Sequence, residues 1–176
     1  MNDKDPVSLT LHGKAWVFGD DVPTDQIVAT RYLFSPMSEA VQHVLENLKP
    51  EFPTQVAKGD IVVAGKHFGQ SSGRARAPKT LQATGIGGVV AESYARTWLR
   101  NCFEIGLPIL ECHGISQAVK DGDVVRADLI EGRVINETTG VELKANPVQP
   151  FLLNMLRTGG LIALVKQKGA DWGRLD

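Results

Sequence analysis

The residues best suited to chemistry lie in one turn, Gly65–Pro78, with the sequence GKHFGQSSGRARAP. An apolar run at 61–64 precedes this turn, and a helical pattern follows it. Its glycines permit positive φ angles and let a ligand approach the backbone closely. Serine hydroxyls, the free amides of a helix start and Arg74 would place donors and positive charge at one point. The turn therefore predicts a site for a carboxylate or phosphate, although such turns also serve as plain connectors.

Nucleotides and polyanions fit this chain less well as ligands. The turn matches neither the GxxxxGK[ST] phosphate loop nor the GxGxxG dinucleotide fingerprint. Nineteen basic and twenty acidic residues give a net charge of −1, and the basic residues form no stripe along the sequence. We therefore expect neither nucleic acid nor an anionic membrane as a partner.

The start MNDKDPVSLTLHG lacks an apolar signal core, and no apolar run approaches the length of a membrane span, so a cytoplasmic protein is expected.

The cysteine content argues against a metal centre held by this chain. The two cysteines, Cys102 and Cys112, lie in separate apolar segments and not in a CxxC pair. Zinc or an iron–sulfur cluster typically needs three or four ligands of this kind. We expect both to be reduced core residues, and no metal bound by the chain alone. His12, His43 and His113 form no ligand pattern, and the role of His67 beside the turn stays open.

The elements around the turn follow a strand–helix alternation. We expect a loop at Val22–Thr30 and a helix that follows a Ser38 N-cap and ends before Pro50. Strand, helix, strand, helix, strand in sequence predicts parallel pairing with crossover helices. The expected strands are Leu9–Phe18, Gly59–Ala64, Gly88–Ala91 and Leu107–Cys112. The expected helices are one that has Pro78 in its first turn, runs through about Ala83 and is closed by Gly85, and one at Ser93–Glu104 that is closed by Gly106.

The second half of the chain changes character. Short β-rich runs at Val124–Ile130, Arg133–Asn136 and Val141–Leu143 are separated by glycine turns, which is typical of an antiparallel meander. A last helix at Pro147–Leu156 and a last strand at Leu161–Val165 are expected to follow. At 176 residues and 43% hydrophobic content, the chain is expected to form a single three-layer mixed α/β domain spanning 1–176.

Three segments together resemble a known family: GDDVPTDQIVATRYL at 19–33, the turn at 65–78 and GGVVAESYARTWLRNCFEIGLPIL at 87–110. They are similar to the small subunit of isopropylmalate isomerase, the swivel domain of the aconitase superfamily. The resemblance implies a β/β/α swivelling domain that pairs, as a heterodimer or heterotetramer, with a large subunit carrying a [4Fe–4S] cluster. It also implies a hydro-lyase that interconverts 2- and 3-isopropylmalate in leucine biosynthesis, or acts on a related alkyl-substituted malate.

The resemblance assigns roles within the turn. The family reads F-G-C-G-S-S-R-E-H-A-P where this chain reads FGQSSGRARAP at 68–78. Ser72 then falls on the catalytic base and Arg74 on the arginine that binds a substrate carboxylate, with Ser71, Gly73 and Arg76 as further substrate-binding positions. Four departures stand out, at Gln70, Gly73, Ala75 and Arg76, so the site is either retuned or impaired. Arg76 could bind another carboxylate or lie solvated on the helix face. A non-catalytic paralogue that acts as a partner or binds small carboxylates is the alternative function.

Two other segments carry expectations from the same resemblance. Thr24 and Asp25 match the family's Thr-Asp, where the aspartate faces the subunit interface and supports groups of the large subunit; the alternative is an ordinary turn aspartate. Tricarboxylate enzymes place an arginine after Tyr-Leu, and here that position is Phe34. An apolar side chain would leave a third carboxylate unpaired, which favours a dicarboxylate with an alkyl substituent. The alternative is that Phe34 packs in the core.

Overall fold

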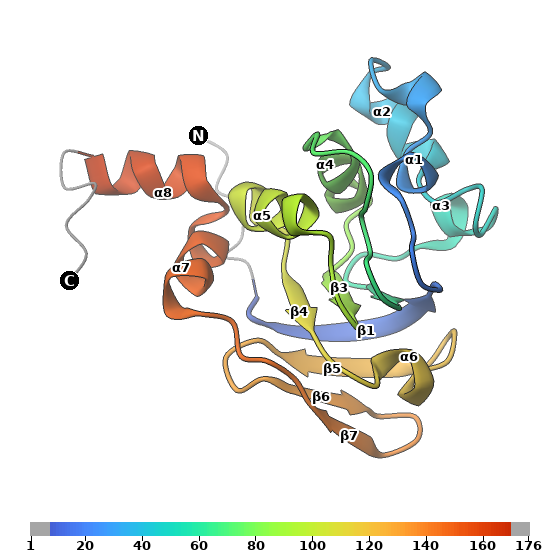
Figure 1. Cartoon of the computed structure of the whole chain (residues 1–176), viewed down its shortest axis with the longest axis vertical. Helices are drawn as coiled ribbons and strands as arrows, with labels where there is room; N and C mark the ends of the chain where they lie inside the picture. Colours follow the sequence, from blue (N-terminus) through green and yellow to red (C-terminus); the bar gives the residue numbers. More distant parts are fainter. Residues whose placement is uncertain (1–7, 170–176) are drawn as a thin grey trace.

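A single mixed sheet organises the molecule, and the strand β1 (Thr10–Val17) joins its two parts (Figure 1). The computed structural model describes residues 8–169. The strand order is β4-β3-β2-β1-β5-β6-β7. The second half of β1 pairs in parallel with β2, and its first half pairs antiparallel with β5. Residues 1–7, part of the start considered for a signal segment, lie outside the described residues.

The parallel part consists of β2 (Ile61–Ala64), β3 (Gly88–Ala91) and β4 (Ile109–Glu111). The helices α4 (Arg76–Ala83) and α5 (Arg96–Ile105) connect these strands. Every residue of β2 and β3 is buried, as expected for parallel strands covered on both faces. The predicted parallel arrangement is confirmed, with β3 at its predicted bounds and the other strands one or two residues shorter at one or both ends.

The antiparallel part is a meander of β5 (Val124–Asp128), β6 (Arg133–Asn136) and β7 (Val141–Lys144). In Figure 1 the meander lies below β1, and α4 and α5 lie above it on the side of the parallel strands. The curled mixed sheet and its helices confirm the expected α/β fold class.

The expected strand at Leu161–Val165 is wrong, because the segment is the helix α8 (Leu161–Lys168). It follows α7 (Pro150–Thr158), which ends at Gly159 with φ +83°. A short apolar run does not distinguish a strand from a buried helix segment. Here the run buries Leu164, and α8 packs against α5 and α7. The residues that follow, Lys166 to Lys168, are good helix formers and extend the element.

The helix expected after Ser38 is also wrong in its start and its length. The segment forms a single turn α2 (Met37–Ala40) and a 3₁₀ turn η2 (Val41–His43), with Pro36 and not Ser38 at the N-cap. Leu45 then takes a positive φ of +57° and donates its amide to the Ile27 carbonyl at 2.9 Å. That tertiary contact buries Leu45 and stops the helix.

Several short turns and boundaries were not expected from the sequence. They are α1 (Thr24–Ile27), η1 (Thr30–Tyr32), α3 (Phe52–Gln55) and α6 (Ile115–Ala118). The helix α4 has Pro78 in its first turn and ends at Ala83, as predicted, and its first residue is Arg76. The helix α5 begins three residues after Ser93 and ends, as predicted, at Gly106 with φ +78°. No helix within 8–169 is long and apolar enough to cross a membrane.

Candidate active site

A pocket of ≈ 330 Å³ lies where the turn after β2 meets the loop after β1. Two chain segments, 24–33 and 71–77, contribute its walls, which are Thr24, Asp25, Val28, Thr30, Leu33, Ser71, Ser72, Arg74, Arg76 and Ala77. The residues predicted from the sequence therefore gather at one place, except Gly73 and Phe34, which do not line the pocket. Because the carboxyl ends of parallel strands meet at one edge of a sheet, their following loops can share such a site.

The turn is locked to the loop after β1 by backbone contacts. Gly69 takes φ +81° and donates its amide to the Val22 carbonyl at 2.8 Å. A Cβ atom at Gly69 would lie 2.2 Å from the Trp98 ring, so a glycine is required there. The amide of Thr24 in turn donates to the Gln70 carbonyl at 2.9 Å. These contacts place Thr24 and the serines of the turn against one another.

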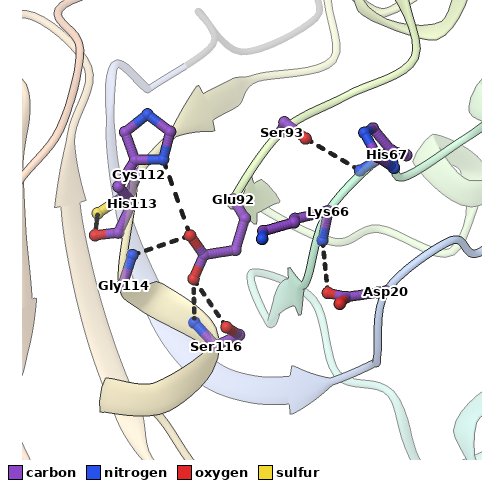
Figure 2. A network of polar contacts seen from close by, with 9 residues as sticks. All are labelled: Asp20, Lys66, His67, Glu92, Ser93, Cys112, His113, Gly114 and Ser116. Atoms are coloured by element: carbon purple, nitrogen blue, oxygen red, sulfur yellow. Dashed lines mark hydrogen bonds and ion pairs between the residues drawn. The ribbon is translucent and has the colours of Figure 1, made fainter.

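Polar contacts also tie together the ends of neighbouring strands where the turn begins (Figure 2). The Lys66 amide donates to the Asp20 carboxylate at 2.7 Å, and the His67 amide donates to Ser93 Oγ at 3.0 Å. His67 Nδ1 lies 2.9 Å from the Asp21 carboxylate, and both side chains are exposed. His67, whose role the sequence left open, is thus placed in an ion pair or hydrogen bond beside the turn.

Glu92, directly after β3, is a buried carboxylate of the same network. It accepts hydrogen bonds from Ser116 Oγ at 2.7 Å, the Ser116 amide at 3.1 Å and the Gly114 amide at 2.9 Å. Burial by itself raises the pKa of Glu92, but these hydrogen bonds outweigh it and lower the pKa below its ordinary value. Glu92 therefore stays ionised and holds the segment after β4 in place.

The two serines of the turn have different partners. Ser71 Oγ lies 3.2 Å from Thr24 Oγ1, and Ser71 has φ +83°. The family pattern has glycine at this position, which the positive φ favours, so Ser71 is a fifth departure that the sequence analysis missed. Ser72 is half-buried, and its Oγ accepts the Arg74 amide at 3.2 Å. A backbone amide directed at Ser72 Oγ would stabilise negative charge on that oxygen.

The turn has further support that sequence reasoning did not find. The buried Asn101 on α5 donates from Nδ2 to the Gly73 carbonyl at 2.9 Å. Gln70, in place of the family cysteine, donates from Nε2 to the Asp21 carbonyl at 2.9 Å. Asn101 is a polar residue among the apolar residues of a predicted helix, and this position could have indicated from the sequence that its side chain has a buried partner. Val28, Thr30 and Ala77 also line the pocket, and the sequence analysis assigned them no role. Leu33 lies in the segment that the resemblance connects with the variable group of the substrate, but Phe34 was the residue expected to contact it.

The structure rules out two of the alternative interpretations. Arg76 is half-buried and donates from Nη2 to the Ser35 carbonyl and, at 3.5 Å, to the Tyr32 carbonyl, so it is not solvated on the helix face. Phe34 is 94% exposed, so it does not pack in the core. Its neighbour Leu33 lines the pocket instead. Asp25 is exposed at the pocket rim, and within 8–169 its carboxylate has no hydrogen-bond or ion-pair partner.

The described residues do not fit an iron–sulfur cluster. Within 8–169, no three His, Cys, Asp or Glu side chains lie close enough to hold a metal ion. Both cysteines are buried, as predicted. Burial raises the pKa of Cys102 well above its usual range and that of Cys112 to about 11, which disfavours the thiolates that ligate iron.

The fold and site define a class of protein. A family model described as the aconitase C-terminal domain matches residues 27–113, which include every pocket residue except Thr24 and Asp25. A crystal structure of 3-isopropylmalate dehydratase from Methanocaldococcus jannaschii superposes with a TM-score of 0.85 at 32% identity, covering 90% of this chain and 95% of that one.

Curated relatives narrow the class to one family. The 3-isopropylmalate dehydratase small subunit 1 of Methanopyrus kandleri is 46% identical over 90% of this chain and 94% of its own length. The isopropylmalate/citramalate isomerase small subunit of Methanocaldococcus jannaschii is 42% identical over 92% of this chain and 96% of its own. The chain belongs to the family of 3-isopropylmalate dehydratase small subunits, which confirms the resemblance inferred from the sequence.

Proposed function

We propose that this chain is the small subunit of a hydro-lyase that dehydrates and rehydrates an alkyl-substituted malate, most simply by interconverting 2- and 3-isopropylmalate. One observation carries this proposal. Ser72, whose Oγ receives a backbone amide, and Arg74 line the same pocket in a chain of this family. The pocket thus combines an oxygen that can hold negative charge with a cation that can bind a carboxylate.

Each residue of the turn has a distinct task in this proposal. Arg74 binds a substrate carboxylate through its guanidinium, which is exposed and free to reach a ligand in the pocket. Ser72 Oγ, as alkoxide, takes the proton from a substrate carbon, and the hydroxyl on the adjacent carbon leaves as hydroxide, giving the alkene. Re-addition of water reverses these steps at either carbon. An iron–sulfur cluster on the large subunit would act as the Lewis acid for the hydroxyl.

The pocket walls support an alkyl-bearing substrate. Val28, Leu33 and Ala77 supply apolar surface beside the polar turn. Arg74 and Arg76 are the pocket's two cations, and Arg76 already donates to backbone carbonyls. Among the residues that the structure describes, Arg74 is therefore the one cation of the pocket lining that is free for a carboxylate, so every further carboxylate of the substrate would have to be paired by the partner subunit. The names of the relatives, isopropylmalate and citramalate enzymes, point to the same class of acid.

The large subunit would complete the site from the open side of the pocket. Asp25 lies exposed at the rim, where it can support groups of a docked partner. Phe34 follows the pocket residue Leu33 in the sequence, and its side chain is almost fully exposed. It can therefore contact either the partner or the variable group of the substrate. We propose an assembly of the two subunits as a heterodimer or heterotetramer, with the [4Fe–4S] cluster held by the partner.

The test is activity of the reconstituted pair. The chain is purified with its large subunit, the cluster is reconstituted, and hydration of the alkene intermediate is followed spectroscopically. Ser72→Ala should lower kcat about 10³-fold, a usual cost of losing a general base. Ser38→Ala, at an exposed serine away from the pocket, should leave kcat unchanged. Full activity of Ser72→Ala would show that Ser72 is not the base.

A non-catalytic paralogue that binds carboxylates is the second candidate, favoured by the departures of the turn at Gln70, Gly73 and Ala75. Calorimetric titration of the isolated chain with small dicarboxylates distinguishes the two. Half of an interfacial site should bind them weakly, whereas a self-sufficient binding module should bind them tightly without a partner. Tight binding together with an inactive reconstituted pair would favour the paralogue.

A further inference from the structure

The loop at residues 30–36, called here the recognition loop, is held from the pocket side by one side chain. Arg76, in the first turn of α4, donates from Nη2 to the carbonyls of Ser35 and Tyr32. Both acceptors belong to the backbone, so the contact fixes the path of the loop whatever side chains it carries. Arg76 stands where the family pattern has histidine, whose ring is shorter and lacks a guanidinium's forked donors.

The same loop is held from its outer side by a cluster around Tyr32. The Tyr32 ring stacks on His43 with centroids 4.0 Å apart and an interplanar angle of 6°. The Arg31 guanidinium lies 4.9 Å from the Tyr32 centroid. Arg31 and His43 both contact the Glu46 carboxylate, at 2.7 and 2.6 Å. The loop is therefore fixed between this cluster and Arg76.

This double anchoring decides which side chain faces the pocket. Leu33 lines the pocket, and the next residue, Phe34, is 94% exposed. The turn is tight, with the Leu33 amide donating to the Thr30 carbonyl at 3.1 Å and the Ser35 amide to the Tyr32 carbonyl at 3.3 Å. A rotation of such a turn by about 120° would exchange neighbouring side chains at the pocket wall, because a 3₁₀ turn has three residues per turn.

We propose that Arg76 is a positioning residue for substrate selection: it holds the recognition loop by its carbonyls so that Leu33 forms the wall against the substrate's alkyl group. This inference rests on the proposed function for its substrate class, an alkyl-substituted malate. Since Arg76 belongs to the turn and begins α4, it also sets the separation between Leu33 and the residues Ser72 and Arg74.

A competing role for Arg76 is direct binding of a substrate carboxylate. Its Nε is buried and has no hydrogen-bond partner among the described residues. A carboxylate that reached this atom would make Arg76 a binding residue. The two roles differ in what they predict: a binding residue affects every dicarboxylate alike, whereas a positioning residue changes the preference between alkyl groups.

The first test needs no partner and no activity. Hydrogen exchange of the Leu33 and Ser35 amides is measured in the isolated chain for the wild type, Arg76→Met and Arg76→Lys. Arg76→Met keeps an unbranched apolar stem and removes the guanidinium donors, so exchange should be about tenfold faster, and Arg76→Lys should partly restore protection. Lys79→Met, at an exposed cation on the same helix, should leave exchange unchanged. Unchanged exchange in Arg76→Met would overturn the anchoring.

The second test uses the reconstituted pair and compares kcat/KM for isopropylmalate with that for methyl-substituted malate. Leu33→Ala and Arg76→Met should each lower this ratio about tenfold, and the double variant should lower it little further, since both act through one wall. Equal losses for both acids, additive with Leu33→Ala, would identify Arg76 as a carboxylate ligand and overturn the proposal. An inactive wild-type pair would instead overturn the proposed function, while the exchange measurement still decides the anchoring.

Discussion

The parallel strands β2 and β3 and the meander strands β5 and β6 bury their residues in different ways. All positions of β2 and β3 are buried, whereas β5 and β6 alternate between buried and less buried positions. Parallel strands need crossover helices and are covered on both faces, while a meander can leave one face to solvent. The difference explains where the site lies. The crossover connections of the parallel part bring loops and the start of α4 to one edge of the sheet, whereas the tight turns of the meander bring no such groups together.

The meander also has a hollow, and its character is instructive. It measures ≈ 690 Å³ and is lined by Glu131, Gly132, Arg133, Glu142, Leu143 and Lys144. Acidic and basic side chains alternate along it, and Arg133 lies 3.8 Å from Glu142. It thus has more room than the pocket at the turn, but it lacks the hydroxyls and the converging amide that mark Ser72. The chemistry of the lining, and not the volume, singles out the site.

The largest expected difference between the two regions concerns turn glycines with positive φ. Gly69→Ala should destabilise the protein by about 4 kcal/mol, because it adds a clash with Trp98 to the backbone cost. Gly140→Ala, in the meander turn with open space around it, should cost only about 1 kcal/mol. Urea unfolding of both variants measures the two values, and equal losses would show that the turn can relax around Trp98.

Substitution of two buried asparagines, Asn136 in the meander and Asn101 beside the turn, is expected to affect stability and activity to different extents. Asn136 in β6 donates from Nδ2 to Ala118 and Asp123 and accepts two amides, so Asn136→Ala should cost about 3 kcal/mol and leave kcat unchanged. Asn101 has one bond, to the Gly73 carbonyl of the turn. Asn101→Ala should cost about 1 kcal/mol but lower kcat about tenfold. Thermal unfolding and activity of the reconstituted pair check both, and a reversed pattern would contradict the placement of the site.

Valines of the two sheet parts test the difference in burial. Val90 in β3 is fully buried, so Val90→Ala should destabilise by about 2 kcal/mol. Val141 at the start of β7 is 42% exposed, and Val141→Ala should change stability by less than about 0.5 kcal/mol. Denaturant midpoints of the two variants give the comparison. A large loss at Val141 would mean that another surface covers the meander edge in solution.

The smallest effect concerns acid stability. The pKa of Glu92 is lower in the folded chain than its ordinary value of 4.5, so its stabilisation is present above that pH and is lost as the pH falls through the folded pKa. Melting temperatures between pH 7 and 3 should therefore drop below about pH 4.5, and less so in Glu92→Gln. Glu142→Gln in the meander, which removes an exposed contact to Arg133, should keep the wild-type profile. Parallel curves for wild type and Glu92→Gln would contradict the Glu92 contribution.

Local patterns sufficed for much of the fold. The apolar run Gly88–Ala91 predicted β3, and the alternation at Arg133–Asn136 predicted β6 with the observed bounds. The short run at Leu161–Val165 was mistaken for a strand because its length fits either structure, and only packing against α5 and α7 selects the helix. The helix after Ser38 failed for a similar reason, since a backbone contact from Leu45 to Ile27 interrupts it.

By itself the sequence determined the alternation of elements, the membership of a family and most of the residues that meet at the pocket, because these follow from local spacing and from matched motifs. Only the tertiary structure decided that Leu33 and not Phe34 faces the pocket, that Arg76 binds backbone carbonyls, and that Asn101 supports the turn. These features depend on where side chains from distant segments come within hydrogen-bonding reach, and the spacing within any one segment carries no information about that.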